Sequence, residues 1–293
     1  MGPNDGAEVK PRPSFSTMPR RISTVRGREF GDGVRATLAA AGLTSRAACQ
    51  LLDWDEAKLS DLVNGKGGST ELELGFLLGI CRTPPLERDH LVTIFRELNV
   101  RGWWQQHGAS LPIMPRTFIE HLNAATEFIS WSPLLVPGLL QIPDYMRAIT
   151  LASATAPAAE VEDRVAARLA MQEVFRRQLK CTFYVHEFAL RLPAGGAQLM
   201  SAQLHHLLRL SVRPYITIRM MPTEVGAHAG LAGPFITMKF DKIEPVVFLE
   251  SENSSLFIEE SNSVDGYKKV LASLDRTALD AEQSRRRITE LAT

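Results

Sequence analysis

The side chains best suited to contact a nucleic acid lie in one stretch near the N-terminus, GLTSRAACQLLDWDEAKLSDLVNGKG at residues 42–67. Hydroxyl and carboxylate groups can bond base edges, and cationic groups can contact phosphates. If residues 42–67 form two short helices, the spacing places one set of these groups on their outer side. These candidates for DNA contact are Ser45, Arg46, Asp55, Glu56, Ala57, Lys58, Ser60, Asp61 and Lys66.

These side chains can reach a groove only if the two helices cross at a tight corner. The pattern offers Cys49 as a small residue for the crossing and Asp53 as a corner that tolerates the left-handed conformation. Leu59 and Leu62 would face inward, and Gly65 would end the second helix. This spacing is typical of a helix-turn-helix, whose second helix enters the major groove. An ordinary pair of packed helices also fits it.

The charge of this region is unusual for DNA binding. Residues 31–107 hold ten acidic and eight basic side chains, a net charge of −2, whereas DNA affinity comes mostly from neutralised phosphates. We expect residues 1–23 to form a disordered basic arm that contacts phosphates or the minor groove. A solvated tail without DNA contacts is the alternative. The cations assigned to this role, counted over residues 1–30, are Lys10, Arg12, Arg20, Arg21, Arg26 and Arg28.

The second half of the chain carries no complete catalytic motif. His186 and Glu187 resemble the start of a zinc-protease helix, but the second histidine is missing at the required spacing. GxSxG, P-loop and GxGxxG patterns are also absent. His121, His186 and His228 are candidates for a spatial cluster, although isolated hydrogen-bonded histidines are commoner. We therefore expect no enzymatic activity, no metal and no cofactor.

A binding surface is the hypothesis for VPGLLQIPDY at residues 136–145. Pro137 and Gly138 predict a turn, and Pro143 suits the first turn of a helix. A structural corner packed against Trp131 explains the same residues. The candidates for contact with an effector or partner are Trp131, Gln141, Tyr145, Arg147 and His228.

Hydrophobic spacing divides the chain into two units. Residues 28–99 have helical spacing throughout, which predicts about five helices. Beyond them, helices are expected at 116–131, 143–153, 159–180, 198–211 and 264–291, and strands at 181–186, 215–220, 234–240 and 245–250. The predicted fold is multidomain: an all-α N-terminal domain and an α+β C-terminal domain with a mostly antiparallel sheet. The expected boundaries are an arm (1–23), a helix-turn-helix domain (24–99), a connector (100–115) and a sensing or dimerisation domain (116–293).

Composition excludes several other classes of protein. The chain has 293 residues, 45% hydrophobic composition and zero formal net charge, which suits globular domains without overall attraction to nucleic acid or membrane. No apolar run approaches a membrane span, and the N-terminus lacks a signal-peptide core. Because Cys49, Cys81 and Cys181 are far apart, we expect no disulfide and a cytoplasmic protein.

Residues 42–66 resemble the Cro and phage-repressor type of helix-turn-helix. RGWW at 101–104 and VPGLLQIPDYMRA at 136–148 resemble a narrower group, the WhiJ-like actinobacterial regulators, whose antitoxin-like C-terminal domain has no characterised function. The similarity continues through HEFALR, GGAQLMSAQLHHLL, GAHAGLAGPF and VVFLES. The chain departs from the family at Ser45, Asp53 and Val63, where Gln, Gly and Glu are usual. Base recognition therefore need not follow the family pattern.

The resemblance implies a sequence-specific, dimeric transcriptional regulator of double-stranded DNA. Its C-terminal domain would bind a small-molecule effector or a small partner protein. One alternative is an antitoxin-like protein that acts mainly by binding such a partner, with weakened DNA binding. Another is an enzyme that kept the helix-turn-helix as a relic.

Overall fold

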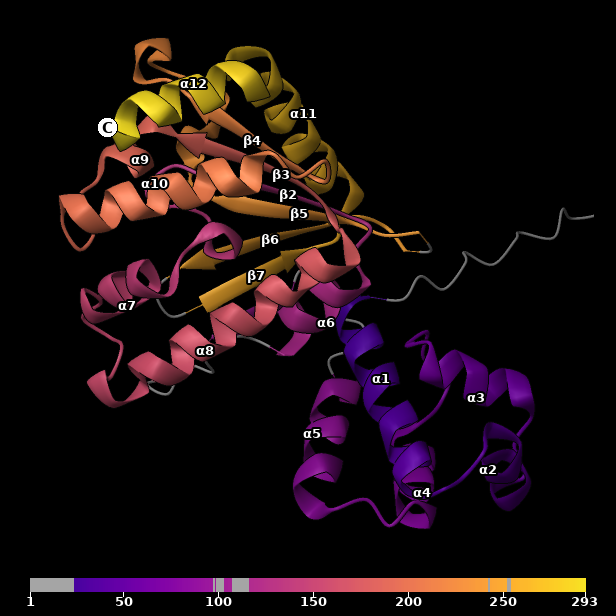
Figure 1. Cartoon of the computed structure of the whole chain (residues 1–293). Helices are drawn as coiled ribbons and strands as arrows, with labels where there is room; N and C mark the ends of the chain where they lie inside the picture. The colour runs from indigo at the N-terminus through magenta and orange to yellow at the C-terminus, as the bar shows by residue number, and fades with distance from the viewer. Residues whose placement is uncertain (1–23, 97, 99–102, 107–115, 242, 252–253) are drawn as a thin grey trace, which may run out of the picture.

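The N-terminal domain is a bundle of five short helices (Figure 1). In the computed structural model, residues 24–293 are described except 97, 99–102, 107–115, 242 and 252–253. Phe30, Val34 and Leu38 recur every four residues along α1 and are buried in the core of the bundle. All the regular elements described within residues 25–96 are helices, as predicted. They are α1 (Val25–Ala40), α2 (Ser45–Leu52), α3 (Glu56–Val63), α4 (Glu71–Ile80) and α5 (Pro85–Arg96).

Polar caps fix where four of these helices begin. Thr24, Thr44 and Asp55 accept hydrogen bonds from backbone N–H groups in the first turns of α1, α2 and α3. Thr70 and Glu73 form a capping box at the start of α4. Each cap satisfies N–H groups that have no partner within the helix itself, so local sequence determines the helix boundaries.

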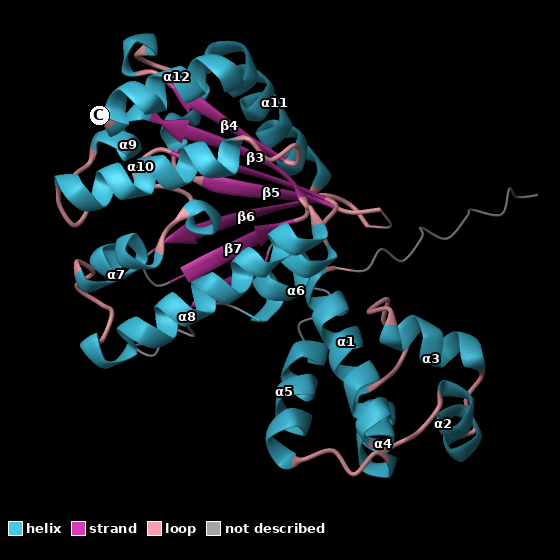
Figure 2. Cartoon of the chain, in the orientation of Figure 1, coloured by secondary structure: helices cyan, strands magenta, loops and turns pink. Residues whose placement is uncertain are grey.

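The C-terminal domain is built on one seven-stranded sheet with the order β1-β7-β6-β5-β2-β3-β4. Figure 2 shows these strands in magenta with helices packed around them. The pairs β2-β3 and β3-β4 are parallel and the four others antiparallel, which confirms a mostly antiparallel sheet. The strands are β1 (Trp103–Gln106), β2 (Glu127–Ser132), β3 (Lys180–His186), β4 (Ile216–Met221), β5 (Phe235–Lys239), β6 (Val246–Ser251) and β7 (Ser254–Ile258).

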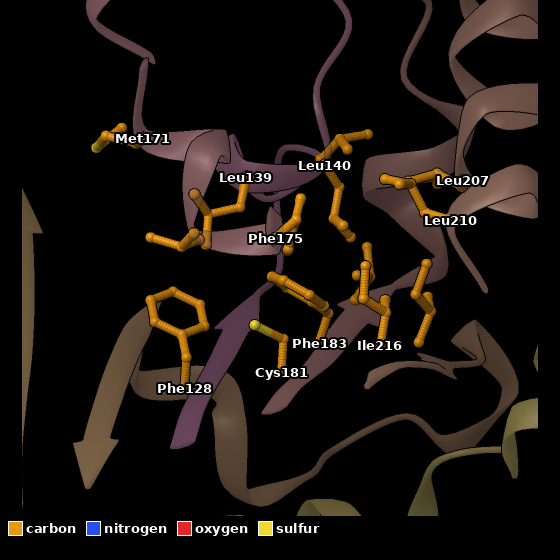
Figure 3. Packing of buried hydrophobic residues seen from close by; sticks show 14 of the residues in the cluster. Phe128, Leu139, Leu140, Met171, Phe175, Cys181, Phe183, Leu207, Leu210 and Ile216 are labelled. Carbon is orange, nitrogen blue, oxygen red and sulfur yellow. The ribbon is translucent and has the colours of Figure 1, made fainter. Parts of the chain in front are cut away.

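Helices cover both faces of this sheet. On one face, Phe128, Phe183 and Phe248 share the main apolar core with residues of α6, α8 and α10, part of which is drawn in Figure 3. On the other face, Trp131 and Phe235 pack with residues of α11. The helices of this domain are α6 (Arg116–Ala124), α7 (Pro143–Leu151), α8 (Val161–Met171), α9 (Glu187–Arg191), α10 (Ala197–Ser211), α11 (Ser261–Thr277) and α12 (Ala281–Ala292).

The sheet contains strands that hydrophobic spacing does not predict. The helix predicted at 116–131 ends at Ala124, and the rest of the segment forms β2. Phe128 and Ser130 of β2 are buried and Glu127 and Ile129 are less buried, which is the two-residue period of a strand, and Trp131 is buried on the other face. β1 lies within the predicted connector and pairs with β7, a short strand rich in serine.

The helix predicted at 264–291 is two helices, α11 and α12. Ala278 is extended, and the N–H of Leu279 donates to the carbonyl of Met220 at 2.9 Å. Asp280 then forms a capping box with Gln283 and starts α12. A backbone contact with β4 therefore interrupts the helical pattern.

The two domains meet at the first turns of α1. Val25 is fully buried in the main core of the C-terminal domain. The carboxylate of Glu29 accepts from Arg26 at 3.1 Å and from Thr117 of α6 at 2.8 Å. This end of α1 thus packs as part of the C-terminal domain.

A second set of bonds at this junction surrounds His121. Arg28 Nε donates to His121 Nε2 at 3.1 Å, and Arg28 Nη2 donates to Glu259 at 3.2 Å. His121 Nδ1 lies 2.7 Å from the carbonyl of Thr117, so Nδ1 is the nitrogen that carries the proton. The assignment of Arg26 and Arg28 to a DNA-binding arm is therefore wrong, because both side chains are occupied inside the junction.

Two further observations concern the whole chain. Among the described residues, no helix has both the length and the apolar character needed to cross a bilayer. The three cysteines are free and buried, and burial raises the pKa of each thiol.

Candidate functional site

The corner between α2 and α3 has the predicted geometry. Asp53 adopts the left-handed conformation with φ 53° and ψ 45°. The N–H of Trp54 donates to the carbonyl of Cys49 at 2.9 Å. Leu59 and Leu62 are buried on the inner side of α3. The two helices therefore pack as a braced pair whose outer side faces solvent.

A close approach of glycines holds α3 against α1. A Cβ atom on Gly31 would lie 2.1 Å from the carbonyl oxygen of Val63, and one on Gly65 would lie 1.9 Å from that of Gly27. Gly65 also has a φ of +64°, which favours glycine. Because the backbones touch here, the position of α3 in the bundle is tightly fixed.

The predicted DNA-contacting residues share this outer surface. The carboxylate of Asp55 is partly engaged, because it accepts from the N–H of Lys58 at 2.6 Å and caps α3. The predicted set is exposed except for Lys58 and Asp61, which are partly buried. The exposed members are Ser45, Arg46, Asp55, Glu56, Ala57, Ser60 and Lys66.

Two of the predicted phosphate-binding cations are already paired. The ammonium of Lys58 forms an ion pair with Glu73 of α4 and lies 4.8 Å from the centre of the Trp54 ring. Lys66 Nζ lies 3.9 Å from the carboxylate of Asp61, which is a looser pair. Lys58 would therefore have to leave Glu73 to contact a phosphate.

Arg46 is the cation with the fewest competing contacts. It is exposed at the start of α2, and in the described part of the chain no hydrogen bond or ion pair engages it.

Arg20 and Arg21, like Lys10 and Arg12, lie outside the described residues. The basic arm therefore stays a prediction.

Two candidates in the C-terminal domain, Trp131 and His228, lie together. Trp131 Nε1 donates to the carbonyl of Gly230 at 2.8 Å, and its ring centre lies 5.2 Å from that of His228 and 6.2 Å from that of His186. His121 is at the domain junction instead. Within the described residues, no three His, Cys, Asp or Glu side chains are grouped for metal binding.

Gln141 and Tyr145 are buried parts of the 136–145 corner. The Tyr145 hydroxyl accepts from the N–H of Val136 at 3.2 Å, and Gln141 Nε2 donates to the carbonyl of Val136 at 2.6 Å. Gln203 of α10, which sequence analysis missed, accepts from the N–H of Ile142 at 2.8 Å. Side-chain amides and a phenol thus hold this loop in place.

Arg147 lies on the outer side of the same region. It pairs with Asp144 at 2.7 Å and with Glu162 of α8 at 2.7 Å, and these hydrogen bonds raise its pKa. In this structure Arg147 links α7 to α8.

A cavity of about 500 Å³ opens between the sheet and helices α7 and α8. Its floor is one row of paired positions across four strands, Phe183, Ser130, Ile236 and Phe248. The loop after β2 and one side of α8 form its walls. Of the predicted ligand residues, Trp131 and Gln141 line it.

Comparison with known protein families gives a match to the C-terminal domain. A family model described as "Domain of unknown function (DUF5753)" matches residues 115–290. The chain belongs to the DUF5753 family. No curated protein matches the chain. The predicted C-terminal domain of uncharacterised function is thus confirmed, while the helix-turn-helix and WhiJ-like assignments stay predictions.

The charged groups in the cavity of the DUF5753 domain were not predicted from the sequence. Arg164 and Arg168 of α8 and Glu250 of β6 line it. Burial lowers the pKa of Arg168 and raises that of Glu250, and the charge of each residue opposes the shift of the other. The sequence held one signal, because two arginines four residues apart share a helix face with the buried Val161.

Proposed function

We propose that this protein is a dimeric, sequence-specific DNA-binding transcriptional regulator whose DUF5753 domain binds an effector or partner. The observation that supports it most is the α2–α3 unit, with its left-handed corner at Asp53 and its buried Leu59 and Leu62. The opposite side of α3 is open to solvent. A helix presented in this way fits the major groove.

The acidic side chains of α3 are compatible with this role. Asp55 caps the N-terminus of α3, where the helix dipole favours a carboxylate. Glu56 is exposed in the first turn and can accept a hydrogen bond from cytosine N4. Phosphate contacts would come from Arg46 and from the predicted arm. Affinity per subunit should therefore be weak.

A dimer would supply the affinity that one subunit lacks. Leu72 and Phe76 stand one turn apart on α4 and are 69% and 57% exposed. Large apolar side chains next to each other at a surface are typical of protein interfaces. Pairing about a two-fold axis would present two copies of α3 to successive turns of the major groove.

Binding of a small partner protein is the second candidate function. The same exposed pair, Leu72 and Phe76, favours it. The ion pair between Lys58 and Glu73 also favours it, because this pair removes a cation from the surface that would face DNA.

Selection from a pool of random DNA duplexes tests the proposal. The full chain should enrich a motif with two half-sites about one helical turn apart. Glu56→Gln should change the selected bases, whereas Asp89→Asn, an exposed acid on α5, should not. A pool that stays random after selection would reject the regulator and favour the partner-binding function.

A further inference from the structure

Buried polar atoms without partners gather at the cavity of the DUF5753 domain. Four residues of the described chain that line the cavity each have a buried side-chain atom with no hydrogen-bond partner. Folded proteins rarely leave such groups unpaired, so each one requires an explanation. The atoms are Ser130 Oγ, Gln141 Oε1, Arg164 Nε and Arg168 Nη1.

Two of these residues are almost completely buried. Ser130 is 2% exposed and lies in the middle of the cavity floor, between Phe183 and Ile236. Gln141 is 3% exposed, and its amide nitrogen is held by the carbonyl of Val136, which leaves its oxygen as an acceptor. The hydroxyl and the amide oxygen can therefore orient a polar group on a bound molecule.

Positive charge predominates among the ionisable groups of the cavity. Arg168 is partly buried, and no described residue forms an ion pair with it. Arg164 pairs with Glu160 at 2.8 Å but leaves its Nε unpartnered. Among the described residues, Glu250 is the carboxylate that lines the cavity. Desolvation of its carboxyl group raises its pKa and the charge of Arg168 opposes that shift, while the residue as a whole is exposed at the surface.

Much of the remaining lining is apolar and suits an organic molecule. Phe118, Phe128, Phe183 and Phe248 line the space, together with Met171 of α8. A volume of about 500 Å³ lies in the range of sites for small organic ligands. Aromatic rings favour a flat or unsaturated body through offset or edge contacts.

We propose that this cavity binds a small amphipathic acid, with its apolar body against the phenylalanine floor and its carboxylate at Arg168. An Arg guanidinium pairs with a carboxylate through two parallel hydrogen bonds, which satisfies the unpartnered Nη1. Ser130 and Gln141 bond a further hydroxyl or N–H group on the body of the ligand.

Helix α6 connects this cavity to the domain junction. Phe118 lines the cavity, with its ring centre 4.7 Å from that of Phe248. Thr117 and His121 of the same helix bond side chains of α1. A bound acid that moves Phe118 would therefore also act on α1. This effector role rests on the proposed DNA-binding function, whereas binding to the cavity does not.

Three compounds with one ring system test the chemical class by calorimetry on the full chain. They are 1-naphthoate, 1-naphthylmethanol and 1-naphthylmethylammonium, which carry a negative, a neutral and a positive group. Naphthoate should bind at least about tenfold more tightly than the other two, the usual effect of one charge-assisted bond. Equal affinities would indicate non-specific apolar binding, and tighter binding of the ammonium would assign the site to Glu250. No binding of any compound would also overturn the proposal.

Variants locate the binding in the cavity. Arg168→Met should remove the preference for naphthoate, and Arg168→Lys should restore part of it. Arg176→Met, an exposed arginine outside the cavity that pairs with Glu173, is the matched control and should bind like the wild type. Melting temperatures show whether each variant folds. If Arg168→Met does not fold, Arg168→Lys is the variant that tests the assignment. A preference for naphthoate as large as that of the wild type would then overturn the pairing of the carboxylate with the Arg168 guanidinium.

Different experimental results would reject the ligand-binding proposal and the proposed function. Naphthoate binding without any DNA binding would leave the cavity as a ligand site and reject the regulator. DNA binding without any naphthoate preference would leave the regulator and reject the amphipathic acid.

Discussion

Asp53 and Asp55 have structural roles at the surface where DNA is expected. Asp53 takes the left-handed conformation at the corner, and Asp55 caps α3. Replacing either would alter the fold and the charge together. Asp61 is different, because it lies beyond the cap and makes a loose pair with Lys66 at 3.9 Å. The charge of Asp61 can therefore be changed with less structural effect than that of Asp53 or Asp55.

Asp61→Arg should strengthen binding to specific and random DNA alike and reduce the ratio between them. The new cation would seek a phosphate, and each added phosphate contact should steepen the slope of log affinity against log salt by about 0.9. Fluorescence anisotropy on both kinds of DNA measures this effect. The control is Asp89→Arg on α5. If Asp61→Arg leaves both affinities unchanged, α3 does not lie in the groove.

At the scale of helices, the contact between α1 and α3 should be sensitive to one methyl group. Gly31→Ala places a Cβ atom 2.1 Å from the carbonyl oxygen of Val63, so the helices must separate. We expect a decrease of about 1–3 kcal/mol in the free energy of unfolding. The matched control is Gly75→Ala in α4, whose added Cβ would meet no atom within 4 Å.

Thermal or denaturant unfolding measures both glycine variants. Gly75→Ala should be neutral or stabilising by up to about 1 kcal/mol, because alanine favours a helix interior. A Gly31→Ala variant as stable as the wild type would contradict the close packing of α1 on α3.

The domain junction should depend on pH through His121. Burial and the neighbouring Arg28 lower the pKa of His121 from 6.5 to about 4. The unfolded state therefore binds the proton more readily than the folded state does. The contribution of neutral His121 to stability is complete above pH 6.5 and is lost as the pH falls toward 4. Each decrease of one pH unit in that window should lower the free energy of unfolding by up to about 1.4 kcal/mol.

The melting temperature of the full chain between pH 7 and pH 5 measures this dependence, with His121→Gln for comparison. The variant has no titrating ring, so its melting temperature should change less than that of the wild type. Parallel curves for the two proteins would show that His121 does not contribute to the dependence.

Local features of the sequence were sufficient to predict the α2–α3 unit. Its caps and its left-handed corner depend on residues a few positions apart, such as Thr44 and Asp53. The cavity could not be predicted in this way, because pairing of β2, β5 and β6 brings Ser130 and Glu250 together from distant parts of the chain. Arg28 was misassigned for the same reason, since its partner His121 lies 93 residues away.

At the scale of the whole molecule, the source of phosphate contacts is the main question. Residues 31–107 have a net charge of −2, and the structure places Arg26 and Arg28 in the domain junction. The cations left to the predicted arm are Lys10, Arg12, Arg20 and Arg21.

Deleting residues 1–22 should weaken DNA binding without unfolding the protein. The slope of log affinity against log salt should fall by about 0.9 for each phosphate that the truncated chain no longer neutralises. The melting temperature should change little, because we expect the arm to bury little surface. The measurement compares salt slopes of the full and truncated chains on one duplex. Identical slopes would mean that the arm is a solvated tail and that Arg46 and Lys66 neutralise the phosphates instead.

The central claim is that this protein recognises a DNA sequence. The most direct measurement is the affinity of the full chain for a duplex from upstream of its own gene and for a shuffled duplex of the same composition, over a range of salt concentrations. The upstream duplex should bind about 10³-fold more tightly at physiological salt, which is the lower range for specific regulators. Equal affinities at every salt concentration would contradict it.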